Sequence, residues 1–162
     1  MAKLEAIKPK SPVIRKDAFL KEFITAFTEV TKGMKADYQA TVRTWTRKVT
    51  FKTGKPQSDG GKFVAFVGTD DKIYGYVDLG TKRHSIRAKG DGYLRFRSGY
   101  IARTIPRVLS SGNKAYLGDW VSKKAVKHPG TQARRFSVII QAKWQDEFER
   151  RMKAAMEKAT KA

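Results

Sequence analysis

The chain has 162 residues, of which 40% are hydrophobic and 11% aromatic, so it is long enough to form one domain with a substantial core. It contains no cysteine, which excludes disulfides and thiolate metal sites, and no apolar run near the roughly 20 residues that a membrane span needs. Lys and Arg number 35 against 15 Asp and Glu, and the net charge of +20 predicts an anionic partner such as DNA, RNA, an anionic membrane or an acidic protein surface.

The first 16 residues contain two prolines and several lysines, which predicts an extended basic arm. A single α+β domain is expected over residues 17–162. It begins with a helix from Asp17, the predicted N-cap, to about residue 40, because apolar residues recur there at steps of three and four. These apolar residues are Phe19, Leu20, Phe23, Ile24, Phe27, Val30, Met34 and Tyr38.

The middle of the chain is rich in β-branched and aromatic residues and predicts about five strands. After a β-rich stretch over residues 42–51 we expect a flexible loop over residues 54–61. Two hairpins are then predicted, one from residues 62–67 and 73–79, the other from residues 83–88 and 93–97. Residues 98–119 have no regular period, and we predict a long loop that orders against a neighbouring subunit.

A short strand is predicted from Trp120 to Val126, before the segment His128-Pro129-Gly130-Thr131. Proline fixes φ, glycine permits a positive φ and threonine can cap a helix, so this segment predicts an elbow that aims the last helix. That helix is expected from about residue 132 to residue 159. The order of helix, strands and helix predicts an α+β fold, with a small, mostly antiparallel sheet flanked by two long amphipathic helices.

The residues that could carry chemistry are few. Only His84 and His128 are histidines, and neither lies in a metal-binding or catalytic motif. We interpret Asp70 and Asp71 as residues of a hairpin turn, and Asp78 as a charge at a strand end. His128 is interpreted as part of the elbow that can bond the turn backbone. We therefore expect no enzyme activity, no cofactor and no metal.

The arginines that follow the elbow need another explanation. Arg134 and Arg135 are placed in the first turn of the last helix, where the helix macrodipole disfavours a cation by about 0.3–1 kcal/mol. Such a position predicts contact with a partner, and we expect the same of Arg150 and Arg151 further along the helix. Basic residues of the predicted loops are the candidates for facing DNA, namely Lys82, Arg83 and Arg87.

Two segments resemble the signature segments of a tailed-bacteriophage family of tail-completion or head–tail joining proteins, the minor tail protein Z-like family. They are YVDLGTKRHSIRAKGDGYLRF, residues 76–96, and VKHPGTQARRF, residues 126–136. The order of predicted elements agrees as well, so the resemblance covers most of the chain after about residue 17. The matching positions are Asp78, Gly80, Thr81, Leu94, Phe96, Val126, His128, Pro129, Gly130, Thr131 and Phe136.

The resemblance implies a structural virion protein in the neck or at the head-proximal end of the tail, made in the host cytoplasm. It would form or join a homo-oligomeric ring, expected to be six-fold, that completes the tail and connects it to the head. Its partners would be the tail tube or tail terminator protein and the head connector or closure proteins. We expect weak contact with packaged double-stranded DNA at most, and no membrane partner.

Two other classes of function are weighed against this one. A basic nucleic-acid-binding protein would explain the charge, although the sequence has no helix-turn-helix, RNA-binding or zinc signature. A nuclease would need clustered carboxylates for metal ions, and the 15 acidic residues are scattered along the chain.

Overall fold

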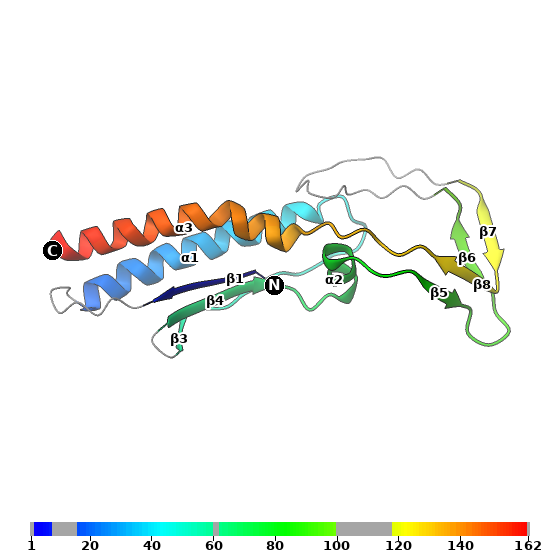
Figure 1. Ribbon diagram of the computed structural model, residues 1–162, viewed down its shortest axis with the longest axis horizontal. Coiled ribbons are helices and arrows are strands. Elements are labelled where there is room, and N and C mark those ends of the chain that lie inside the picture. Colours follow the sequence, from blue (N-terminus) through cyan, green and yellow to red (C-terminus); the bar gives the residue numbers. More distant parts are fainter. Residues whose placement is uncertain (1, 8–15, 60–61, 100–117, 162) are drawn as a thin grey trace.

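The structure, a computed structural model, describes residues 2–7, 16–59, 62–99 and 118–161 of the chain. The molecule is elongated, with two long helices over a sheet at one end and a two-stranded ribbon at the other (Figure 1). A short helix, α2 (Lys72–Leu79), lies between these two parts. The predicted α+β fold is confirmed.

The two long helices are α1 (Lys16–Thr41) and α3 (Phe136–Lys161), which run antiparallel side by side. Most of the predicted apolar stripe of α1 is buried, and Phe27 packs edge-on against Phe148 of α3 with ring centroids 5.1 Å apart. Burying one such side chain contributes about 1.5–3 kcal/mol. The predicted first helix is therefore confirmed, although Asp17 lies inside its first turn and not at the N-cap.

The sheet is built around β4 (Lys62–Gly68). Strand β1 (Ala2–Ile7) pairs antiparallel along one edge of β4, and β2 (Lys52–Thr53) and β3 (Gln57–Asp59) pair antiparallel with its other edge. Because the side chains of a strand alternate, Ala65 and Val67 are buried whereas Phe66 is 48% exposed. The helices cover the buried face, with α1 against β4 and α3 against β1 (Figure 1).

The strand β1 corrects the prediction of an arm over residues 1–16. Residues 2–7 belong to the sheet, and residues 8–15 lie outside the described residues. The predicted loop over residues 54–61 likewise contains β3. By contrast, residues 42–51 hold turns and irregular backbone, although the sequence predicts a β-rich stretch there.

The first predicted hairpin is wrong, because residues 73–79 are helical and not extended. Asp71 is the N-cap of α2, where its carboxylate accepts hydrogen bonds from the backbone nitrogens of Ile73 at 2.9 Å and Tyr74 at 3.0 Å. Tyr74 and Asp78 are both buried, and their spacing of four residues places them on one face of the helix. A capping carboxylate therefore replaces the predicted turn.

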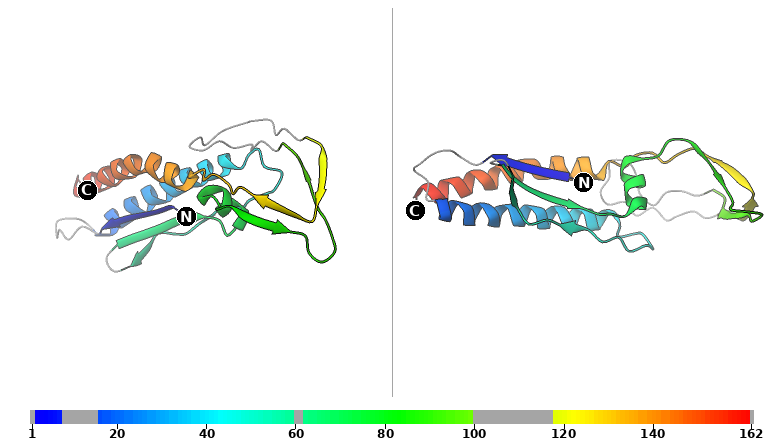
Figure 2. Two further views of the ribbon diagram at one scale, coloured as in Figure 1. Left: turned by 45° about the vertical axis from the view of Figure 1, so that its right-hand side comes forward. Right: turned by 90° about the horizontal axis from the view of Figure 1, so that it is seen from below.

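The second predicted hairpin is also wrong. Strand β5 (His84–Arg87) pairs with β8 (Ala125–His128), and β6 (Leu94–Arg97) pairs with β7 (Trp120–Lys123), both antiparallel. The chain thus runs outward through β5 and β6 and returns through β7 and β8, forming a bent two-stranded ribbon (Figures 1 and 2). The segment that the sequence predicts as one final strand is two strands separated by Lys124.

Candidate functional site

The two segments that carry the family resemblance meet at one place, the junction between α2, the ribbon and α3. Thr81 and Thr131 form an antiparallel bridge in which each backbone nitrogen donates to the other residue's carbonyl oxygen, at 2.9 and 3.1 Å. The Thr81 hydroxyl also accepts from the Thr131 nitrogen at 2.9 Å. Residues 50 positions apart in the chain are joined here, so the two segments form one structural unit.

The glycines of the two segments permit this close approach. Gly80 and Gly130 both have positive φ, 78° and 94°. A Cβ atom at Gly80 would lie 2.7 Å from the carbonyl oxygen of Thr131, and one at Gly130 would overlap the carbonyl oxygen of Thr81. Both positions therefore require glycine for two reasons, backbone conformation and space.

Asp78 links α2 to the start of α3. Its side chain is buried, with 4% exposed, and it accepts a hydrogen bond from the backbone nitrogen of Ser137 at 3.1 Å. This nitrogen is one of the donors at a helix N-terminus that have no partner within the helix, and the negative charge also suits the macrodipole. Asp78 is therefore a capping residue, and its interpretation as a strand-end charge is wrong.

The backbone of α2 completes this connection. The carbonyl oxygens of Val77 and Asp78, in the last turn of α2, accept hydrogen bonds from the nitrogens of Arg134 and Arg135 at 3.0 and 2.9 Å. Because α3 begins at Phe136, Thr131 is too far away to cap it, and the cap comes from Asp78 instead. The end of one helix thus holds the beginning of another.

Tyr74 anchors α2 in the core. Its ring packs against Tyr38, Trp45, Phe51 and Phe136, with centroid distances of 5.0–6.1 Å. Burial raises the pKa of its hydroxyl well above the ordinary range. The junction is therefore fixed to the body and not only to the ribbon.

The two histidines lie side by side at the base of the ribbon. His84 and His128 are paired across β5 and β8, and their ring centroids are 5.0 Å apart. The Nδ1 atom of His128 accepts from the nitrogen of Gly130 at 3.0 Å, which confirms that this histidine bonds the turn backbone. The Nδ1 atom of His84 donates to the carbonyl oxygen of Lys82 at 2.8 Å. Both rings thus stabilise local turns.

The two arginines before α3 have different environments. Arg134 is 7% exposed and its guanidinium donates to the Gln132 carbonyl oxygen at 3.1 Å, so the prediction that it contacts a partner is wrong. Arg135 is exposed and adopts a positive φ of 56°, which is rare for a residue other than glycine. Both precede the helix, which corrects their predicted place in its first turn.

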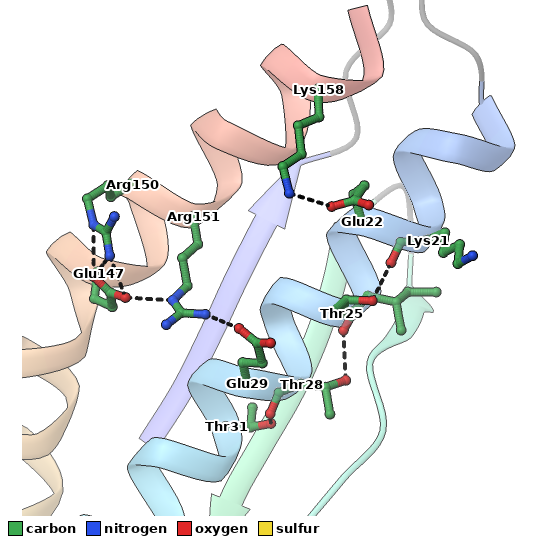
Figure 3. Close-up of polar contacts among 11 residues, drawn as sticks. Lys21, Glu22, Thr25, Thr28, Glu29, Thr31, Glu147, Arg150, Arg151 and Lys158 are labelled. Atoms are coloured by element: carbon green, nitrogen blue, oxygen red, sulfur yellow. Dashed lines mark hydrogen bonds and ion pairs between the residues drawn. The ribbon is translucent and has the colours of Figure 1, made fainter. Parts of the chain in front are cut away.

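Arg150 and Arg151 form ion pairs within the chain (Figure 3). Arg150 binds Glu147 on the same helix, and Arg151 bridges Glu147 of α3 and Glu29 of α1. Hydrogen bonds from Arg150 and then Arg151 hold the pKa of Glu147 below its ordinary value. Arg151 therefore serves the contact between the two helices, while the expected partner contact of the exposed Arg150 stays a prediction.

The remaining positions of the resemblance lie on the ribbon. Leu94, Phe96 and Val126 line an apolar hollow of about 700 Å³ on the ribbon surface, together with Ile86 and Trp120. Lys82, Arg83 and Arg87, the predicted DNA-facing residues, are all exposed. The sequence interpretation missed Tyr93 and Trp120, which are each 61% exposed although aromatic. A signal was present, since each directly follows a glycine and an aspartate, Asp91-Gly92 and Gly118-Asp119, which are typical of an exposed turn.

No group of three or more His, Asp or Glu residues is arranged to hold a metal ion among the residues that the structure describes. Within the same residues, no helix is both long enough and apolar enough to cross a membrane. Of the predicted loop over residues 98–119, residues 100–117 lie outside the described part of the chain. Comparison with protein families, with curated proteins and with solved structures finds no match for this chain.

Proposed function

We propose that the protein is a structural component of a tailed-bacteriophage neck or tail. It would form or join a ring at the head-proximal end of the tail, complete the tail and connect it to the head. The observation that carries this proposal is the junction: the two segments that resemble the family's signature form one unit, joined by Thr81, Thr131 and Asp78.

The exposed surface of the ribbon supports an assembly role. Its apolar hollow is lined by Ile86, Leu94, Phe96 and Val126. Apolar surface of this kind on a projecting element is typical of protein contact sites. A ring needs such a heterologous surface, because each subunit must bind two neighbours through different patches.

Arg135 is the residue of the junction that we assign to a neighbouring subunit or neck protein. Its positive φ is a backbone conformation that is unfavourable for arginine. Its side chain is exposed and places a positive charge at the start of a helix, where the macrodipole disfavours it. Neither feature stabilises the free chain, so a contact outside it would explain the arginine.

The test is tail joining by phage particles that lack this protein, supplemented with purified wild type or variants. Arg135→Gly removes the charge and the strained conformation together, so its free energy of unfolding should be unchanged or up to about 1 kcal/mol higher. Its joining activity should nevertheless fall. Lys153→Gln, at an exposed position of α3 away from the junction, is the control and should join tails normally.

Two results would contradict the proposal. Mass spectrometry of purified virions should detect the protein, and its absence would exclude a virion component. Full joining activity of particles that never received the protein would exclude a role in completion. If Arg135→Gly protein supported normal tail joining while particles without the protein failed to join, the neck role would stand. The contact assigned to Arg135 would then be refuted.

A further inference from the structure

The ribbon, here residues 82–99 and 118–128, carries an excess of positive charge. Its nine Lys and Arg residues are opposed by only two Asp residues, and all nine cations are exposed. They are Lys82, Arg83, Arg87, Lys89, Arg95, Arg97, Lys123, Lys124 and Lys127. The salt bridges that the structure describes all lie in the body, and none of these nine residues forms one with a described residue. The charge of the ribbon is therefore available to a partner.

One cluster of cations lies at the base of the ribbon. Arg83, His84, Ser85 and Lys127 line a hollow of about 230 Å³. Ser85 and Lys127 are directly paired across β5 and β8, so a hydroxyl and an ammonium group come from opposing strands. Two cations and a hydroxyl donor form the kind of set that binds the oxygens of a phosphate group.

A second cluster lies on the outer part of the ribbon. The guanidinium groups of Arg97 and Arg95 lie 4.9 and 5.8 Å from the centroid of the Trp120 ring. The ammonium group of Lys124 lies 5.8 Å from the Tyr93 ring centroid. These cation–π contacts hold the positive groups at the ribbon surface, next to two aromatic rings that are each 61% exposed.

We infer that the ribbon is a binding surface for the phosphate backbone of double-stranded DNA, independent of base sequence. Lys127 lines both the small hollow and the larger one that Arg95 and Arg97 line, so the two clusters are neighbours. A duplex carries one negative charge for about every 1.7 Å of its axis and can therefore contact both. Stacking of a single strand on the exposed Tyr93 and Trp120 rings is the alternative that the experiment separates from duplex binding. The choice of DNA among polyanions rests on the proposed neck function. The existence of the cationic surface follows from the ribbon residues alone and does not depend on that function.

The experiment measures binding of the purified full chain to a labelled duplex of about 20 base pairs, by fluorescence anisotropy from about 50 to 200 mM salt. Two double variants remove charge from the clusters: Arg83→Gln with Lys127→Gln, and Arg95→Gln with Arg97→Gln. The control, Lys21→Gln with Lys32→Gln, removes the same charge from exposed positions of α1. Circular dichroism and urea unfolding establish that every variant folds.

Each ribbon variant should bind the duplex about tenfold more weakly than wild type at the lowest salt, and its slope of log affinity against log salt should fall by about two. The affinity of the control variant for the duplex should stay within about twofold of the wild-type affinity. Equal loss in the control would overturn the inference, because diffuse net charge would then explain binding. Tighter binding of a single strand of the same length would also overturn it, as would binding of polyglutamate but not of DNA.

This measurement contains no phage component, so its outcome is independent of the neck proposal. Ribbon variants that lose DNA binding but join tails normally would leave both the DNA surface and the structural role in place. Wild-type protein that joins tails but binds no duplex would refute the inference and leave the proposed function intact.

Discussion

At the scale of single residues, four positions determine the junction, and each has a physical reason. Gly80 and Gly130 have positive φ and no room for a Cβ, Asp78 supplies a buried cap, and His128 accepts the hydrogen bond of the turn. The two glycines are the least replaceable of these, because a substitution there meets both conformational strain and backbone atoms.

Gly130→Ala should lower the free energy of unfolding by at least about 3 kcal/mol, or prevent folding, since the new Cβ would overlap the Thr81 carbonyl oxygen. Gly90→Ala is the matched control. Gly90 also has a positive φ, 58°, but no heavy atom lies within 4 Å of its Cβ position, so only about 1 kcal/mol should be lost. Urea unfolding of both variants checks this. Equal losses of unfolding free energy would show that the backbone of the junction can move to accommodate the new methyl group.

At the scale of elements, the contact between α1 and α3 depends on both packing and charge. Gly33 of α1 lies directly under the Trp144 ring of α3, whose Nε1 atom donates to Asp37 at 2.7 Å. Lys143 also binds Asp37, at 2.7 Å. Nearer the helix ends, Lys158 pairs with Glu22 (Figure 3). Steric fit at Gly33 sets how closely the helices approach, and the exposed ion pairs add little by comparison.

Two helical glycines should respond to alanine in opposite ways. Gly33→Ala should lower the free energy of unfolding by about 1–3 kcal/mol, because the new methyl group would fall inside the Trp144 ring and the hydrogen bond to Asp37 restrains that ring. Gly75→Ala in α2, with no atom within 4 Å of the Cβ position, should raise it by about 0.5–1 kcal/mol through helix propensity. Thermal and urea unfolding measure both, and stabilisation by Gly33→Ala would show that the helices can separate without cost.

Acid should weaken the ion pairs that Glu147 forms within α3. The pKa of Glu147 is held below its ordinary value in the folded chain, first by Arg150 and then by Arg151. A lowered folded-state pKa stabilises the protein above the ordinary carboxyl pKa, and this stabilisation is lost as the pH falls through the folded value. We therefore expect the urea midpoint of wild type to exceed that of Glu147→Gln at neutral pH and the two to converge below about pH 4. A difference between the two urea midpoints that stayed constant from neutral pH to below about pH 4 would contradict the assignment of this stabilisation to ionised Glu147.

At the scale of the whole molecule, the body and the ribbon differ in how they are stabilised. The body buries a continuous core that includes Phe27, Val30, Met34, Tyr38 and Phe136. The ribbon has two strands at each point, and its large side chains are half-buried or exposed. A two-stranded ribbon is marginally stable by itself, so this one depends on its attachment at the junction.

Hydrogen exchange should reveal this difference. Amide protons of β5–β8 should exchange through local opening of lower free energy than those of α1, α3 and β4, whose opening requires loss of the core. Addition of a DNA duplex should slow exchange in the ribbon and leave the helices unchanged. Mass spectrometry after proteolysis reads out both, and equal protection of ribbon and body in the free protein would contradict this expectation.

Local patterns in the sequence determined the elements whose environment lies within the same stretch of chain. The apolar period of residues 19–38 predicts α1, and the sequence His128-Pro129-Gly130 predicts the turn, because sterics and helical spacing act between near neighbours. The α+β class followed from the same local reasoning. The interpretation of Asp71 as a turn residue was wrong because a carboxylate that favours a turn also caps a helix, and the sequence of α2 does not distinguish the two.

Which distant segments meet could be seen only in the folded chain. The pairing of β5 with β8 and of β6 with β7, the bridge from Thr81 to Thr131 and the cap that Asp78 provides for α3 all join residues at least 20 positions apart. Strand pairing depends on hydrogen bonds between backbones, which are common to all sequences, so local composition does not select the partner. Arg134 shows the same limit: its charge suggested a surface contact, and packing around the junction buries it.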